Sequence, residues 1–152
     1  MSHQKYISKE YFIKRLGDLC LRSGLSGFPA GQEEQHILMK SAVLTLGSSG
    51  SFSEREIDTK LQLWISEIVE LKGIDHVTMR RCLIDAGYLI RNKEGTCYQI
   101  SDTPQPYSFE SDIEQIDIAA EIQNERDKIA RRKKDYLEKQ QLSSQNNTQK
   151  GS

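Results

Sequence analysis

Side chains that could contact a nucleic acid gather between residues 75 and 95. They are one threonine, three arginines and one lysine, namely Thr78, Arg80, Arg81, Arg91 and Lys93. An arginine can donate two parallel hydrogen bonds to a guanine edge, and a threonine hydroxyl can reach a base edge or a phosphate. These residue types predict contacts with double-stranded DNA. We expect Arg81 to face a base edge and Arg91 and Lys93 to neutralise phosphates.

A helix and a hairpin must position these residues. Asp75 can cap a helix over residues 76–86, and Gly87 can end it. Two β-prone runs follow, residues 88–91 and 96–100, and four turn-forming residues join them. The helix would bury a stripe of Met79, Leu83 and Ala86, so that Arg81 points outward, flanked by Thr78, Arg80 and Asp85.

Three further helices are predicted before this point, over residues 8–23, 33–46 and from Ser53 to about Leu71. Ser53 and Glu56 form a capping box, and a buried stripe follows them at helical spacing. The stripe is Ile57, Leu61, Trp64, Ile68 and Leu71. Residues 51–53 predict a short extended stretch. The order of helix, short strand, helix, helix and hairpin predicts an α+β, mainly α, winged helix-turn-helix fold, whose third helix enters the major groove.

Composition divides the chain into four parts. We expect an N-terminal helix and loop (1–27), a winged-helix domain (28–102), a linker with a long charged helix (103–142) and a disordered tail rich in Gln, Asn and Ser (143–152). The charged helix is predicted over residues 110–141. Apolar residues at heptad spacing, Ile122, Ile129 and Tyr136, make it a candidate for a homodimer or a protein partner, and the basic residues from Arg126 to Lys134 could add phosphate contacts.

Enzyme chemistry finds no support in the sequence, so no enzyme, metal or cofactor is expected. His3, His36 and His76 are scattered, and no HExxH, Walker, GxSxG or GxGxxG motif occurs. Cys20, Cys82 and Cys97 are an odd count without a paired motif, which is typical of reduced thiols; a redox-sensing Cys82–Cys97 pair is the alternative to buried apolar thiols. With neither a signal core nor an apolar span, we expect a cytoplasmic protein with no membrane contact.

Two blocks of sequence resemble the bacterial domain of unknown function numbered 2087. The blocks run from Ser53 to Asp58 and from Asp75 to Arg91, ending near Gly95 and Tyr98, and the whole resemblance covers about residues 28–100. The family has no established activity. The resemblance implies a small prokaryotic domain that stands alone or is fused to DNA-binding heads in predicted transcriptional regulators, and therefore a regulatory setting. The helix after Ile57 is longer here than the family pattern implies.

The first hypothesis is a non-enzymatic, DNA-binding transcriptional regulator that acts as a dimer. The alternative is a protein–protein interaction or dimerisation module of the same fold without DNA binding. Residues 51–100 hold seven basic and eight acidic residues, a net charge of −1, so duplex affinity would depend on local patches. Val77 and Ile84 flank Arg81 and could pack against the terminal helix. Arg80 or Arg81 could also pair with Asp85 or Glu56 and serve the fold alone.

Overall fold

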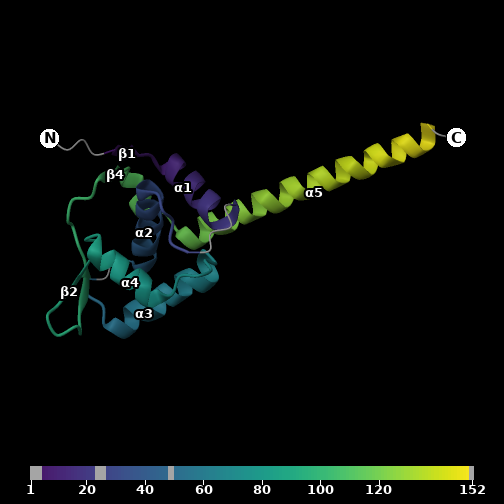
Figure 1. Cartoon of the computed structure of the whole chain (residues 1–152). Coiled ribbons are helices and arrows are strands. Elements are labelled where there is room, and N and C mark those ends of the chain that lie inside the picture. Colours follow the sequence, from purple (N-terminus) through teal and green to yellow (C-terminus); the bar gives the residue numbers. More distant parts are fainter. Residues whose placement is uncertain (1–4, 23–26, 48–49, 151–152) are drawn as a thin grey trace. The chain divides into compact units, whose positions relative to one another are not determined.

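The computed structural model describes residues 5–22, 27–47 and 50–150, and the side chains of these residues up to 143. Within these residues the chain is α+β and mainly helical, with five α-helices and two small two-stranded sheets (Figure 1). The chain divides into two compact units, residues 1–122 and residues 123–152. None of the described helices has the length and apolar character needed to cross a bilayer.

The two ends of the first unit meet in a small parallel sheet. Strand β1 (Lys5–Ile7) pairs with β4 (Tyr107–Phe109), with Ile7 opposite Phe109. Helix α1 (Lys9–Gly17) begins at its cap Ser8 and continues as a π-helical turn over Asp18–Arg22. The sequence predicts this helix correctly but leaves both strands out. Three-residue strands are too short for an alternating pattern to reveal them, and their partners lie far apart in the chain.

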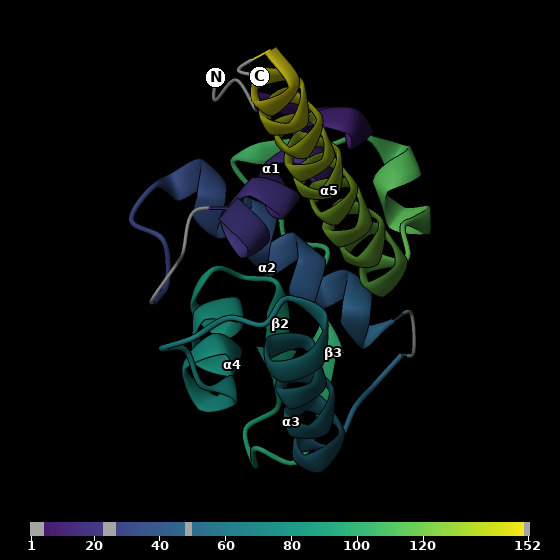
Figure 2. The ribbon, with the colours of Figure 1, turned by 90° about the vertical axis from the view of Figure 1, so that its right-hand side faces the viewer.

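Helix α2 (Gln32–Leu46) forms the centre of the unit. It buries residues on most of its circumference, among them Ile37, Leu38, Ala42 and Leu46, which is typical of a helix enclosed by its neighbours. Figure 2 shows α2 between α1 and the pair α3 and α4. Its buried Ser41 accepts a hydrogen bond from Trp64 Nε1 at 3.1 Å, which satisfies the indole N–H of that buried ring.

Helix α3 (Glu54–Leu63) begins with the predicted capping box of Ser53 and Glu56. It then widens into a π-helical turn over Trp64–Ile68, where the Val69 N–H bonds the Trp64 carbonyl at 2.9 Å. The chain is therefore helical as predicted to Ile68, and the helix ends three residues before Leu71. Leu71 lies after the helix, in a turn where Glu70 has a φ of 51°, but it is buried like the residues of the helical stripe. The apolar spacing alone therefore does not show where the helix ends.

Helix α4 (His76–Asp85) begins at its predicted cap Asp75, and Gly87 follows its end with a φ of 82°. The predicted hairpin is present as β2 (Leu89–Arg91) and β3 (Tyr98–Ile100), paired antiparallel. The short extended stretch is also confirmed, because Phe52 and Tyr98 exchange two backbone hydrogen bonds of 2.8 Å. This bridge ties the chain before α3 to the hairpin.

Helix α5 (Ile118–Lys150) begins later than predicted and extends further. Residues Ser111–Gln115 form a 3-10 turn that buries Ile113, and the Asp117 carboxylate then accepts the N–H of Ala120. This turn accounts for the late start. Polar Gln, Asn and Ser continue the helix to Lys150, where the sequence predicts a disordered tail; Gly151 and Ser152 lie outside the described residues.

Candidate nucleic-acid-binding surface

Helix α4 has one buried and one exposed face. Met79 and Leu83 are fully buried, whereas Thr78 and Arg81 are exposed, as their spacing predicts. The Asp75 carboxylate accepts the N–H of Thr78 at 2.7 Å, and bonds from Thr78 hold the pKa of Asp75 below its usual range. The cap fixes the first turn, so Thr78 and Arg81 stand in defined positions on the exposed face.

Arg80, the neighbour of Arg81, faces α3 instead of solvent. Its guanidinium forms ion pairs with Asp58 and Glu54, the latter at 3.3 Å, and it lies over the ring of Tyr98 at 6.0 Å. Its side chain is 16% exposed. The sequence placed Arg80 among the DNA contacts and named Asp85 or Glu56 as possible partners. The structure gives it different partners, both on α3, and a role in joining α4 to α3 and β3.

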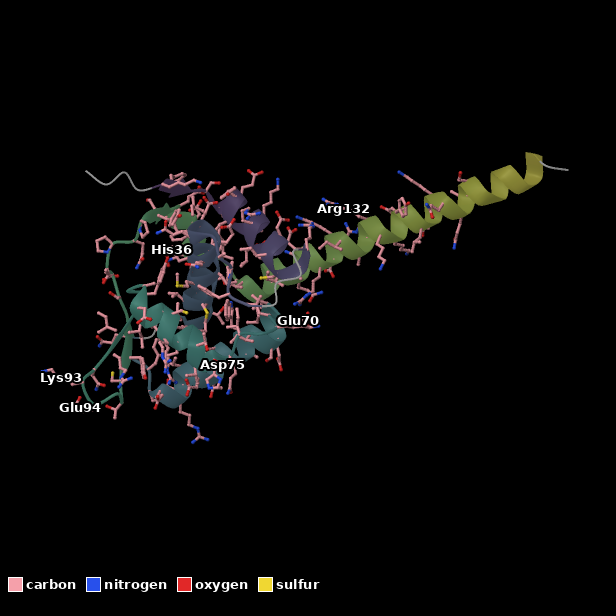
Figure 3. The ribbon with its side chains drawn as sticks, viewed as in Figure 1. His36, Glu70, Asp75, Lys93, Glu94 and Arg132 are labelled. Carbon is pink, nitrogen blue, oxygen red and sulfur yellow. The ribbon has the colours of Figure 1, made fainter. Side chains whose placement is uncertain are left out.

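The hairpin carries the other two predicted contacts, Arg91 at the end of β2 and Lys93 in the turn, and both are exposed. The Asn92 side chain shapes the turn by accepting the N–H groups of Thr96 at 2.9 Å and Cys97 at 3.1 Å. In Figure 3 Lys93 and Glu94 lie at the tip of the hairpin, away from the helices. The Arg91 guanidinium lies close over Gly95, so it stays beside the turn.

The charges on this surface are balanced. Between residues 75 and 95, three exposed bases, Arg81, Arg91 and Lys93, accompany three exposed acids, Asp75, Asp85 and Glu94. A duplex would therefore be attracted by individual bases and by a weak overall field.

Two exposed apolar side chains belong to the same elements. Val77 on α4 is 37% exposed and Ile90 on β2 is 54% exposed. Ile84, which the sequence placed with Val77 beside Arg81, packs partly buried against the core instead. Successive residues of a strand point to opposite faces, so burial of Leu89 turns Ile90 outward, but the run Leu89–Arg91 does not alternate between apolar and polar residues and gives no sequence signal for this.

The remaining side chains that could take part in chemistry, a histidine and three cysteines, are buried or partly buried. His36 is buried, and its Nδ1 lies 2.8 Å from the hydroxyl of Tyr88. Among the described residues, no group of three or more His, Cys, Asp or Glu side chains could hold a metal ion. The three cysteines are free, and burial raises the pKa of the Cys82 thiol, which keeps it protonated and weakly reactive.

Comparison with known proteins identifies a family. The family model described as "Uncharacterized protein conserved in bacteria (DUF2087)" matches residues 24–100. No curated protein and no solved structure matches the chain. The matched residues run from before α2 to the end of β3, so they contain all of the candidate surface.

Proposed function

Because this chain belongs to the family of uncharacterized bacterial proteins DUF2087, and the matched residues include α4 and the hairpin, we propose that it is a non-enzymatic winged-helix module that binds double-stranded DNA. In this proposal α4 is the recognition helix and the β2–β3 hairpin is the wing. The module would act in transcription regulation, as a dimer.

The order of elements supports the winged-helix assignment. Helix α2 is followed by the extended Phe52, then by α3, α4 and the hairpin. The Phe52–Tyr98 bridge holds the extended residue before α3 beside the hairpin. Residues 69–75 separate the end of the π-helical turn from the start of α4, a longer connection than the three- or four-residue turn of a helix-turn-helix motif.

The observation that carries the proposal is that Arg80 is ion-paired within the fold whereas its neighbour Arg81 is exposed. Arg80 anchors α4 through Asp58 and Glu54, while Arg81 is exposed one position further along. An anchored helix that presents a guanidinium can read a guanine edge without the entropic cost of ordering the helix on binding. Arg91 and Lys93 on the wing would contact phosphates of the adjacent backbone.

Because the exposed bases and acids between residues 75 and 95 are equal in number, the proposal also requires further bases from a second copy of the chain and from the C-terminal unit. A single surface with three exposed bases neutralises few phosphates, so its affinity for duplex would be low and would depend only weakly on salt. Two copies on a two-fold symmetric site would double these contacts. The second unit adds four consecutive exposed bases, Arg131, Arg132, Lys133 and Lys134.

The test is a selection of duplexes from a random pool, followed by anisotropy titration of a selected and a scrambled duplex at several salt concentrations. Arg81→Ala should weaken the selected complex by about 1–3 kcal/mol and the scrambled one much less. Lys93→Ala should weaken both alike and lower the salt slope by about one. Lys14→Ala, an exposed lysine on α1, is the matched control and should change neither.

Absence of any duplex binding at low salt would overturn the proposal. So would a selected complex that Arg81→Ala and Lys14→Ala weaken to the same extent, because then α4 would not read the sequence.

The second candidate is a protein-interaction or dimerisation module, and exposed apolar residues on α5 favour it. Tyr136 and Leu142 are each 61% exposed and Leu137 is 50% exposed. Light scattering of the full chain against a chain ending at residue 126 separates the candidates. A smaller oligomer after truncation, together with no duplex binding by the full chain, would favour this alternative.

A further inference from the structure

A cavity of about 710 Å³ opens in the first unit, and no residue of α4 lines it. Its walls come from the C-terminal half of α2, the chain that follows β3, and strand β4. The apolar part of the wall comprises Val43, Leu44, Ile100 and Phe109, with Tyr88 beside them. This volume falls within the range of small-molecule sites, which combine apolar walls with a few polar groups.

Lys40 is the one cation among the described lining residues. Its side chain is only 13% exposed, and its Nζ lies 5.5 Å from the centre of the Phe109 ring. Nζ forms an ion pair with the carboxylate of Glu114, whose side chain is 56% exposed. The two partners therefore differ in solvent exposure, because the ammonium lies in the wall of the cavity while the carboxylate reaches it from the solvent side.

This inequality indicates what the cavity can bind. A nearly buried ammonium needs an anion beside it, since removing the anion leaves a desolvated charge. A solvent-exposed carboxylate gives up such a pair at little cost, because water solvates it again. A ligand carboxylate that enters the cavity can thus take the place of Glu114 on Lys40.

We propose that this cavity binds a small aromatic monocarboxylate, with its carboxylate on Lys40 and its ring against Phe109, Val43 and Leu44. Two acids at the rim, Glu114 and Asp102, are exposed and disfavour a second negative charge on the ligand. Lys40 already occupies the position over Phe109 that an amine would take. The hydroxyls of Ser101 and Thr103 bond each other at 2.5 Å, and the one that accepts this bond can still donate to a polar substituent on the ring.

The site adjoins the C-terminal end of α4 through the chain after β3. The Ser101 N–H bonds the Tyr88 carbonyl at 2.9 Å, and a Cβ added at Gly87 would lie 3.3 Å from Thr103. A ligand in the cavity would touch this chain directly, because Ser101 and Thr103 line the cavity together with Tyr88. The proposal itself goes beyond DNA binding and does not rest on it, so its test is made without DNA.

The test uses the full chain and three probes, namely phenylacetate, its neutral isostere phenylacetamide and the cationic phenethylamine, each titrated by ¹H–¹⁵N NMR to millimolar concentration. Phenylacetate should shift amide signals of lining residues and bind at least about tenfold more tightly than the amide or the amine. Lys40→Met should remove this preference. Glu114→Gln should tighten phenylacetate binding severalfold, because the competing carboxylate is gone.

Lys72→Met, an exposed lysine outside the cavity, is the matched control and should leave the affinity unchanged. If Lys40→Met fails to fold, Glu114→Gln and Lys40→Arg carry the test, the first by tighter binding and the second by retained binding. The proposal is overturned if phenylacetate does not bind, if the amide binds equally well, or if Glu114→Gln weakens binding.

Discussion

At the scale of single residues, two adjacent arginines have opposite surroundings. Successive residues on an α-helix are turned by about 100°, so Arg80 and Arg81 cannot share a face. Arg80 lies toward α3, where Asp58 and Glu54 receive it, and Arg81 lies toward solvent. Replacing Arg80 would therefore report on the fold and not on a ligand, and only Arg81 tests recognition.

His36 shows how burial changes the chemistry of a residue. It is 6% exposed, its ring centre lies 5.7 Å from that of Tyr88 and 5.0 Å from that of Tyr107, and its Nδ1 contacts the Tyr88 hydroxyl. Burial lowers the pKa of its imidazole, because the charged form loses its hydration. The neutral ring is thus the form that the folded chain accommodates.

The first prediction concerns pH. Above about pH 6.5 His36 is neutral in both the folded and the unfolded chain, so its burial costs nothing in protonation. As the pH falls below this value the unfolded chain takes up the proton first, and the free energy of unfolding decreases by at most about 1.4 kcal/mol per pH unit until the lowered pKa is reached. Urea denaturation across this range should show the decrease.

His36→Gln should lack this part of the pH dependence, whereas His76→Gln, on the surface of α4, should retain it. Identical pH profiles for the parent chain and His36→Gln would contradict the account.

At the scale of elements, α4 is held at both ends and along its side. Asp75 caps its start, Arg80 fixes it to α3, and its end closes through hydrogen bonds from Gly87 to Ile84 at 3.0 Å and from Tyr88 to Leu83 at 2.9 Å. Gly87 has a φ of 82°, in the left-handed region that glycine adopts without a steric penalty. This residue lets the chain leave α4 and enter β2 directly.

The second prediction is that Gly87→Ala lowers the free energy of unfolding by about 1–2 kcal/mol, because a Cβ is disfavoured at this φ. The new methyl would also lie 3.3 Å from Thr103. The matched control is Gly50→Ala, where a Cβ would meet nothing within 4 Å and φ is not left-handed; it should cost less than about 0.5 kcal/mol. Urea denaturation of the parent chain and the two variants measures the free energies of unfolding. If the two variants lose equal free energy, the left-handed φ of Gly87 does not constrain the end of α4.

At the scale of the whole molecule, one core serves the first unit. Its buried side chains come from β1, α1, α2, α3 and α4, from the hairpin, and from Ile113, Ile118 and Ile122 after it. In the described side chains beyond Ile122, none is buried. The family-matched residues 24–100 thus share their core with segments on both sides.

The third prediction compares two truncations. A chain ending at residue 126 keeps the whole core, so its free energy of unfolding should remain within about 0.5 kcal/mol of the full chain. A chain of residues 28–102 loses seven buried side chains from the core, those of Ile7, Phe12, Leu16, Leu19, Ile113, Ile118 and Ile122. At about 1.5–3 kcal/mol for each, this loss matches the entire stability of an ordinary domain. Urea denaturation should therefore find no cooperative transition, and a cooperative one would show that residues 28–102 fold alone.

Much of the fold was accessible from the sequence because its signals are local. Caps at Ser8, Ser53 and Asp75, the stop at Gly87 and the turn at Asn92 each depend on hydrogen bonds within a few residues. The same spacing placed Thr78 and Arg81 on the exposed face of α4. The end of α3 was missed because a buried stripe cannot distinguish a helix from a turn that buries the same residues.

By itself, then, the amino-acid sequence determined where α1, α3 and α4 start, the mainly helical character, and the outward face of α4, since these follow from neighbours along the chain. The tertiary structure alone decided the β1–β4 pairing, the partners of Arg80 and the Lys40 cavity. Each of these joins segments remote in sequence, and such contacts form only when the common core brings the segments together. Burial of that core selects among many pairings that local propensity leaves equal.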